Sequence, residues 1–475
     1  MTPIRGKVLR RDPAREADYI HTMGEIVDRV NSVACPETPY DWFIWSADAK
    51  AAVHVKNGSY APELSARAAL LGGAVEAGWA CDLRVCASDG KTGGIFVEGP
   101  GRFEAERVAV SLSGDGAGIG GPATGAAVRQ GGELVLRHAV IHSAGLTHYA
   151  TVAEEHSVLR VYDSVLSSHG IPFGEGQPQP EGIMRTPPPG LMIEGNSRTH
   201  CTMTGSHSYF YRCALLSDGW GALSTEAAEG YVYLEANDSR VVTLRRGYGA
   251  YADPGCHVVL NRCGVDSADM AGIVGGQGEM IFRDCDVRCG ACFLLLHSVM
   301  GVAEEISRVE VSGGRIRSKG PALLIRSDNA IVVFDRAELH ADQGVLVHTQ
   351  INADPLAAPA GDAPYGIDVT FRSMDLQGDI LHEDAQRELY VSLERSVWRG
   401  AMRNGCLRMD VGSKWTATAD SELTLLGEVQ PAQLDALAGV TVRLHGGQSG
   451  QMVLPSGGTL VLVAGPEHNQ QGVHL

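Results

Sequence analysis

The sequence lacks the features that would place the protein in a membrane or on nucleic acid. Between Met1 and Asn31 no apolar run is long enough for a signal peptide or a membrane span. No basic stripe stands out, and the net charge of -17 argues against a phosphate-rich partner, since phosphate binding needs a basic field. We therefore expect a cytoplasmic protein that binds neither nucleic acid nor a membrane.

Several sequence signatures of catalysis are also missing. There is no HxH or HExxH spacing and no nucleophile elbow. The glycine-rich runs at Gly114–Gly121 and Gly275–Gly278 precede no helix with a Walker Lys-Ser/Thr, so they are predicted to be turns. The 11 cysteines fall short of the density of a disulfide scaffold. We expect no cofactor, although ligands for a divalent metal could come together from distant parts of the chain.

Glycine and short apolar runs are abundant. The chain has 59 glycines and 44% apolar residues, and ten apolar runs recur between turn residues. Several runs lie about twenty-two residues apart, as in Val259 to Ile281, Val311 to Val333, Val369 to Val391 and Leu324 to Leu346. Short strands at such a period are typical of a parallel β-solenoid. The runs are Gly94–Val97, Leu134–Leu136, Val158–Val161, Tyr231–Leu234, Val258–Leu260, Met280–Phe282, Val309–Val311, Ile331–Phe334, Val369–Phe371 and Leu389–Leu393.

The ends of the chain and two internal segments depart from this rhythm. Residues 1–50 contain a helical apolar pattern over Ala14–Val33 and an aromatic run at Tyr40–Trp45, which predict an N-terminal helical cap. Residues 51–430 would form the solenoid and residues 431–475 its C-terminal coils or cap. Proline-rich or alanine-rich insertions are expected near 170–205 and 351–366, where long loops would gather on a binding face.

Two turns near the middle of the chain resemble each other. The phrase Asp-Gly-Trp-Gly-Ala-Leu-Ser-Thr at Asp218–Thr225 is followed by Arg-Gly-Tyr-Gly-Ala-Tyr-Ala-Asp at Arg246–Asp253. We interpret them as equivalent parts of successive coils. Trp220 would then stack on Tyr248, with Leu223 beside Tyr251 and Thr225 beside Asp253. A structural aromatic ladder explains the two rings as well as a binding site does.

This strand rhythm resembles the right-handed parallel β-helix proteins of the pectin-lyase-like superfamily. The resemblance covers roughly Ala51 to Leu425 and implies an all-β, single-stranded right-handed parallel β-helix. The Ser-x-Trp strands at Ser396–Gly400 and Ser413–Leu423 look like terminal coils of bacterial adhesins and autotransporter passengers. Polygalacturonases of the superfamily carry a paired Asp-Asp that has no counterpart between Ser168-His169-Gly170 and Arg315-Ile316-Arg317. The resemblance therefore implies a fold and names no activity.

Histidine, tyrosine, arginine and aspartate crowd the coils around the two similar turns. Histidine and tyrosine suit proton transfer at neutral pH, and arginine can hold a carboxylate or an enolate. Each of them could instead be a satisfied turn residue, and a structural role is the commoner one for a single histidine. The catalytic candidates are His207, Tyr248, Asp253, Tyr209, His200 and His257, and the substrate-binding candidates are Arg198, Trp220, Tyr251, Asp218, Arg246 and His148.

Three functions fit this cluster. The first is a lyase or isomerase acting on a sugar acid or another oxygenated ring, by proton transfer from histidine or tyrosine with arginine stabilising the anion. The second is a glycoside or other hydrolase with Asp218 and Asp253, or Glu226, as paired carboxylates. The third is a non-enzymatic, adhesin-like surface β-helix. The expected partner is a small molecule or an oligosaccharide, and a homo-oligomer is compatible with the sequence.

Overall fold

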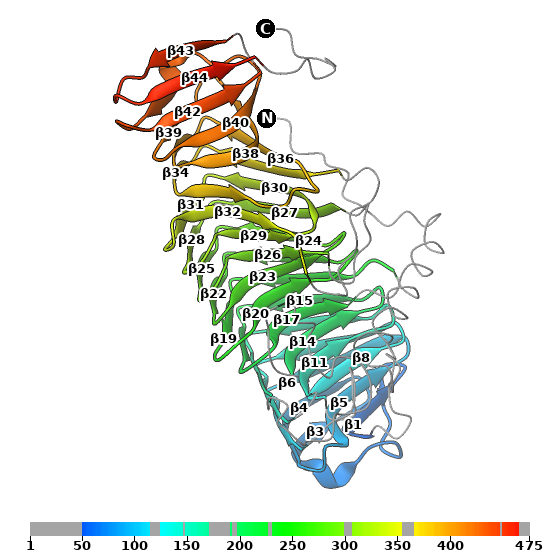
Figure 1. Ribbon diagram of the computed structural model, residues 1–475. Coiled ribbons are helices and arrows are strands. Elements are labelled where there is room, and N and C mark those ends of the chain that lie inside the picture. Colours follow the sequence, from blue (N-terminus) through cyan, green and yellow to red (C-terminus); the bar gives the residue numbers. More distant parts are fainter. Residues whose placement is uncertain are drawn as a thin grey trace.

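The computed structural model describes residues 50–114, 124–145, 148–170, 191, 197–226, 230–298, 306–353, 365–446 and 449–464. Apart from Lys50, the predicted helical cap lies outside these residues. Within them the chain is all-β, and its strands stack coil upon coil from β1 at one end to β44 at the other (Figure 1). The helical elements with described bounds are two short turns, η2 (Arg67–Ala69) and η4 (Pro431–Gln433). The predicted parallel-stranded solenoid is confirmed.

Strands in equivalent places of successive coils pair in parallel, and three sheets result. Sheet 1 matters most for the site described below, and each of its strands joins the equivalent strand of the next coil. Its strands are β1 (Lys50–Lys56), β5 (Thr92–Glu98), β8 (Ala126–Arg129), β11 (Tyr149–Ala153), β14 (Arg198–Met203), β17 (Gly221–Glu226), β20 (Tyr248–Ala252), β23 (Met270–Gly275), β26 (Leu294–His297), β29 (Leu323–Arg326), β32 (Val345–Gln350) and β35 (Asp379–His382).

Sheet 2 follows sheet 1 within each coil and contains nearly all of the predicted apolar runs. Nine of the ten runs overlap its strands, and Gly94–Val97 falls in β5 of sheet 1. The sheet comprises β6 (Gly101–Glu106), β9 (Gly132–Arg137), β12 (Val158–Tyr162), β15 (His207–Tyr211), β18 (Tyr233–Asn237), β21 (His257–Asn261), β24 (Glu279–Arg283), β27 (Ile306–Ser312), β30 (Asn329–Asp335), β33 (Ile367–Arg372) and β36 (Leu389–Glu394).

Sheet 3 completes each coil with short strands, and near the C-terminal end four of them pair separately. The sheet comprises β7 (Ala109–Ser113), β10 (Val140–Ala144), β13 (Val165–His169), β16 (Ala214–Ser217), β19 (Arg240–Thr243), β22 (Gly264–Ser267), β25 (Asp286–Cys289), β28 (Arg315–Ser318) and β31 (Glu338–Ala341). The four that pair separately are β34 (Asp375–Gln377), β37 (Val397–Arg399), β39 (Lys414–Ala417) and β41 (Leu434–Ala436).

The two ends of the described solenoid carry antiparallel pairs. At the first end β2 (Ser59–Tyr60) pairs with β1, and β3 (Leu70–Val75) pairs with β4 (Trp79–Ala87). At the other end β38 (Met402–Met409), β40 (Ser421–Leu426) and β42 (Thr441–His445) continue the parallel stack. The last pair there is the hairpin of β43 (Gly450–Val453) and β44 (Thr459–Val463).

Apolar side chains fill the lumen because alternate residues of each strand point inward. A continuous core cluster runs from Ala52 to Leu460. In the C-terminal coils Trp398 and Trp415 are in register and stack at 5.1 Å. Their indole N–H groups donate to the carbonyl oxygens of Gly378 (2.8 Å) and Gly400 (2.9 Å). The two Ser-x-Trp strands therefore occupy equivalent places in successive coils.

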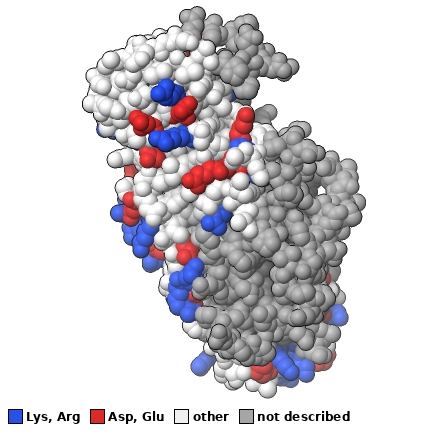
Figure 2. Space-filling view, viewed as in Figure 1, with Lys and Arg blue, Asp and Glu red and all other residues white. Residues whose placement is uncertain are grey.

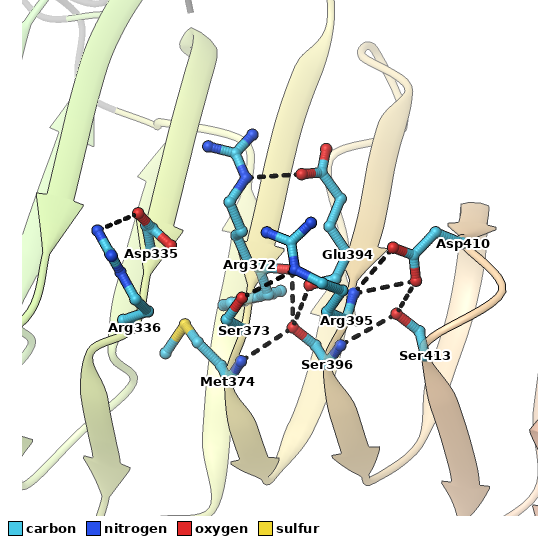
Figure 3. Close-up of polar contacts among 11 residues, drawn as sticks. Asp335, Arg336, Arg372, Ser373, Met374, Glu394, Arg395, Ser396, Asp410 and Ser413 are labelled. Atoms are coloured by element: carbon cyan, nitrogen blue, oxygen red, sulfur yellow. Dashed lines mark hydrogen bonds and ion pairs between the residues drawn. The ribbon is translucent and has the colours of Figure 1, made fainter. Parts of the chain in front are cut away.

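The corner between sheets 2 and 3 is a tight turn fixed by polar ladders. One residue per coil adopts a left-handed conformation there, as at Ser373 (φ 53°) and Arg395 (φ 49°). The next residue is often a serine or a cysteine that points inward. Ser396 accepts the Met374 N–H (3.1 Å), and its own N–H donates to Ser413 (3.1 Å) (Figure 3). These contacts satisfy backbone groups that the turn would otherwise leave buried without partners.

Charged side chains link neighbouring coils on the outer surface. Asp163 with Arg212, and Asp238 with Arg262, form paired hydrogen bonds of 2.6–2.8 Å at this corner. Acidic and basic side chains are interspersed over the described part of the face shown in Figure 2. Exposed pairs of this kind stabilise a protein only weakly. We therefore infer that they help to align neighbouring coils more than they contribute to stability. Among the described residues no helix is long and apolar enough to cross a membrane.

Two details of the predicted rhythm were wrong. Val369 does pair with Val391 and Val259 with Ile281, but Val311 pairs with Phe334 and Leu324 with His348. The coils compared here thus differ in length by one or two residues, and a one-residue shift turns a side chain to the other face of a strand. The insertion predicted at 170–205 also ends too late, because its last residues form β14 and the turn after it.

Candidate functional site

Because side chains alternate along each strand, the residues of sheet 1 divide into those that face the lumen and those that face outward. Leu223 and Ala250 are in register on β17 and β20 and belong to the lumen core. The next residues along these strands, Ser224 and Tyr251, are also in register and therefore point away from the lumen. On this outer side a second apolar cluster is buried. It comprises Leu191, Trp220, Tyr248, Tyr251, Met270, Ile273, Cys292, Leu295 and Leu324.

A buried ion pair lies at the edge of this second cluster. Arg198 from β14 bonds through Nη1 to Oε1 of Glu226 from β17, and each residue is 2% exposed. The Arg198 guanidinium also lies 4.6 Å from the centre of the Trp220 ring. Burial opposes the charge of Arg198, but Glu226 outweighs it and holds the pKa of Arg198 well above its usual value. Arg198 therefore stays positively charged.

The two carboxylate oxygens of Glu226 differ in their hydrogen bonding. Oε1 accepts the bond from Arg198, whereas Oε2 is buried and has no hydrogen-bond partner within the described ranges. A buried carboxylate oxygen without a partner carries a desolvation cost that native structures rarely keep without a use. This oxygen could accept a hydrogen bond or a proton from a group placed against it.

Three tyrosines surround the ion pair and keep their protons. Burial raises the pKa of Tyr149, Tyr248 and Tyr251 above the ordinary value of a phenol. Tyr251 also forms a hydrogen bond with the Asp253 carboxylate, which raises its pKa further. The hydroxyl of Tyr248 lies 2.7 Å from that of Ser224. These phenols are therefore donors near neutral pH, suited to binding an anion or to protonating one.

The ends of the sheet 1 strands form a line of residues that we call the outer column: Met203, Glu226, Asp253, Gly275 and His297. Met203 pairs with Glu226, and Gly275 pairs with His297. Asp253 follows directly after β20 and bonds through its N–H to Thr225 of β17 (3.1 Å). The His297 ring stacks on Tyr251 at 6.1 Å. Five coils thus bring two carboxylates and an imidazole, far apart in sequence, to one edge.

Five predicted site residues meet on this outer face: Arg198, Trp220, Tyr248, Tyr251 and Asp253. His200 does not. It is in register with Leu223 and faces the lumen, where it contacts Phe210 and bonds to Thr151 (2.9 Å) and Thr202 (2.7 Å). Burial lowers its pKa to about 3, so it stays neutral and cannot transfer protons near pH 7.

His207, Tyr209 and His257 lie on a different face, the outer side of sheet 2. His207 packs edge-on against Tyr209, Tyr231 and Tyr233. His257 bonds through Nδ1 to the Glu279 carboxylate, and its ring lies 4.6 Å from that of Tyr231. These residues cluster as predicted, but the corner between sheets 1 and 2 separates them from Arg198. The sequence could not reveal this because both sheets contribute to every coil.

Asp218, Arg246 and His148 lie near the other end of the sheet 1 strands, where sheet 3 gives way to sheet 1. Asp218 is held by ion pairs to His169 and Arg245, and Arg246 pairs with Asp269. His148 is buried just before β11. Asp218 precedes β17 and Asp253 follows β20, so at least the five residues of β20, roughly 17 Å, separate them along the strands. That distance is too long for a catalytic carboxylate pair.

The predicted register of the two similar turns was wrong by one residue. Gly221, not Trp220, pairs with Tyr248, and Ser224, not Leu223, pairs with Tyr251. Tyr251 therefore faces outward beside the ion pair and does not continue a lumen row. For the same reason, the sequence analysis did not predict that Cys201, Ser224 and Gly275 face outward. Glu226 was considered only as a substitute carboxylate.

Metal ligation has little support in the described residues. In those ranges no group of three or more His, Cys, Asp or Glu side chains is placed to hold an ion. The sequence does contain one Cys-x-x-Cys, at Cys289 and Cys292, but burial raises the pKa of both thiols and leaves them protonated.

Comparison of the chain with protein-family models, with curated proteins and with solved structures finds no match.

Proposed function

We propose that the protein is an enzyme of the lyase or isomerase kind. It removes a proton next to the carboxylate or carbonyl group of a small oxygenated molecule, such as a sugar acid. The observation that carries the proposal is the buried Glu226 carboxylate, whose Oε2 atom has no partner among the described residues. The base is therefore Glu226 in place of the histidine that the sequence pattern favoured.

Arg198 and the buried tyrosines supply the other half of the chemistry. Removing a proton next to a carboxylate leaves an enolate, whose charge must be stabilised in a site that excludes water. Arg198 carries a permanent positive charge beside Glu226, and Tyr248 keeps its proton and can act as a donor. Preorganised donors of this kind contribute most when they are already held in place by packing. Trp220 fixes the guanidinium plane from one side.

A hydrolase is the second candidate. Glu226 and Asp253 end neighbouring strands of sheet 1, and strands in a sheet are about 4.8 Å apart. Retaining glycosidases use two carboxyl groups about 5 Å apart, so this pair fits better than Asp218 with Asp253. Against it, both carboxylates already accept bonds, from Arg198 and Tyr251.

We extend the proposal to the handedness of the solenoid, the cellular compartment and the partners of the protein. The three sheets per coil and their parallel register support a right-handed, single-stranded β-helix of the pectin-lyase-like kind, because parallel crossovers are nearly always right-handed. The ten cysteines in the described ranges are all free, which supports a reducing compartment such as the cytoplasm. A small molecule or a short oligosaccharide remains the proposed partner, and a homo-oligomer is compatible with this scheme.

Hydrogen–deuterium exchange tests the proposal without knowledge of the product. The protein is incubated in D2O with a panel of aldonic and uronic acids, and loss of the signal of the proton next to the carboxylate is followed by NMR. We expect exchange for part of the panel and a drop of about a hundredfold or more in Glu226→Gln, which cannot accept the proton. His340→Gln, on the outer side of sheet 3, is the matched control.

Two results would contradict this proposal. Exchange at the wild-type rate in Glu226→Gln would remove Glu226 as the base. Release of reducing sugar from glycosides, with no exchange of any acid, would favour the hydrolase.

A further inference from the structure

The outer side of sheet 3 carries a hollow of about 710 Å³ between β19 and β28, strands that lie side by side in Figure 1. One row of outward residues forms its floor. In register from strand to strand, the row consists of Val242, Asp266, Arg288 and Arg317. A second hollow of about 660 Å³ adjoins the first, and Arg288 and Arg317 line both. The two arginines therefore lie in the middle of one continuous trough.

Two cations of the first hollow lack a counter-charge in the described part of the chain. Arg288 and Lys319, which follows directly after β28, are exposed, and neither side chain forms an ion pair or a hydrogen bond with a described residue. The carboxylates around them are each bonded to an arginine. The pairs are Asp266 with Arg240 (3.2 Å), Asp286 with Arg315 (3.1 Å) and Asp342 with Arg317 (3.0 Å). Two positive charges are therefore uncompensated, in a chain whose net charge is -17.

The side of the hollow toward β19 is apolar. Leu244, directly after β19, is 62% exposed, and Val242 and Ala268 lie half-buried beside it. Two strand spacings, or roughly 10 Å, separate β19 from β25, which carries Arg288. A molecule no longer than a substituted aromatic ring can therefore contact Leu244 at one end and Arg288 at the other.

We propose that this hollow binds a small phosphate monoester, with its phosphate at Arg288 and Lys319 and an apolar organic part against Leu244. A guanidinium presents parallel donors that match two phosphate oxygens, and an ammonium adds a further donor. A phosphate monoester carries close to two negative charges at neutral pH and so balances both cations, whereas a carboxylate balances only one. Arg317 bonds to Asp342 through Nε, and its Nη atoms bond to no described residue. This site lies on a different sheet from Glu226 and does not depend on the proposed activity.

Calorimetric titration with phenyl phosphate tests the site directly. Inorganic phosphate and benzoate are titrated in parallel, because one lacks the ring and the other lacks the second charge. We expect inorganic phosphate to bind about threefold to tenfold more weakly than phenyl phosphate, since it makes no apolar contact. Benzoate should bind about tenfold more weakly, because a single charge leaves one cation unpaired. Leu244→Ser should remove the preference for phenyl phosphate over inorganic phosphate.

Arg288→Met keeps an apolar stem and removes the charge, so we expect it to weaken the binding of phenyl phosphate about tenfold or more. Arg399→Met is the matched control. Arg399 is also an exposed outward residue of sheet 3, on β37, but its neighbours in register, Gln377 and Thr416, are uncharged. The control should bind phenyl phosphate as the wild type does. Circular dichroism checks that both variants keep their strand content.

Four results would contradict the proposal. Equal weakening in Arg288→Met and Arg399→Met would show a response to net charge alone and would overturn the site, as would a wild type that does not bind phenyl phosphate. Benzoate that binds as tightly as phenyl phosphate would overturn the assignment of a phosphate. Inorganic phosphate that binds as tightly as phenyl phosphate would overturn the role of Leu244.

Discussion

At the scale of single residues, burial decides which groups can act. His200 and Glu226 are two positions that the sequence treats alike, each polar and each in a strand of sheet 1. One faces the lumen, where two threonines satisfy its nitrogens. The other faces outward with one oxygen unpartnered. The two residues differ in whether the side chain points into the lumen or away from it. The residue types in the sequence do not reveal this direction.

Glu154 provides a test of burial that does not depend on catalysis. It is 7% exposed, and burial, helped by the charge of Glu155, raises its pKa to about 7. The native state therefore binds this proton more tightly than the unfolded chain, whose glutamates titrate near 4.3. The resulting stabilisation is complete at acid pH and is lost as the pH rises through about 7.

We expect Glu154→Gln to remove this loss. Between pH 5 and pH 8 the free energy of unfolding of the wild type should fall relative to that of the variant, by up to about 3 kcal/mol. Urea unfolding at several pH values measures the difference. Glu63→Gln, at an exposed position, serves as the control. A constant difference across the pH range would mean that Glu154 is ionised in the folded protein.

At the scale of elements, the polar ladder of the corner between sheets 2 and 3 fixes one coil on the next. The Ser396 hydroxyl donates to the Phe371 carbonyl (2.9 Å) and accepts the Met374 N–H (3.1 Å). Cys213, Cys263 and Cys285 occupy the same corner in other coils and donate to carbonyls in the same manner. Serine and cysteine are therefore interchangeable in the donor role of this turn.

Ser396→Ala should lower the free energy of unfolding by about 1–3 kcal/mol, because a buried N–H and a buried carbonyl lose their partner. The measurement is urea unfolding at one pH. Ser88→Ala, at an exposed position, should change it by less than about 0.5 kcal/mol. Equal effects of the two substitutions would show that the ladder contributes nothing to stability.

The elements also show how far the sequence could be read. Apolar runs such as Val369–Phe371 and Leu389–Leu393 located sheet 2, because these strands alternate clearly between polar and apolar residues. Sheet 1 was harder, since β14, β17 and β20 are buried on both sides and show no alternation. The candidate site lies on these strands. The sequence therefore identified candidate residues of the site by their type. It did not reveal which way their side chains point or which residues pair across strands.

At the scale of the whole molecule, each coil contacts mainly its two neighbours, so coils are separable units. Ile367 of β33 pairs with Leu389 of β36, twenty-two residues later, and the inward residues of both strands are apolar. Deleting residues 367–388 removes one complete coil and joins Gly366 to Leu389. β36 would then pair with β30 in the register that β33 has now.

We expect this deletion variant to fold, with its long dimension reduced by about 4.8 Å. Small-angle scattering measures the dimension, and circular dichroism measures the strand content. Deleting residues 368–388, one residue fewer, is the control, because it shifts the register by one and turns apolar side chains outward. If the two variants were equally folded, side-chain parity would not determine how the coils stack.

The outer column has a consequence for how such a site could change over time. Glu226, Asp253, Gly275 and His297 come from four coils, and each reaches the site from its own segment of chain. A substitution, or even the exchange of one coil for another of equal length, alters one group of the site while its neighbours keep their backbone. In a solenoid of this kind, a chemical step can therefore be gained or lost through a change in one coil at a time.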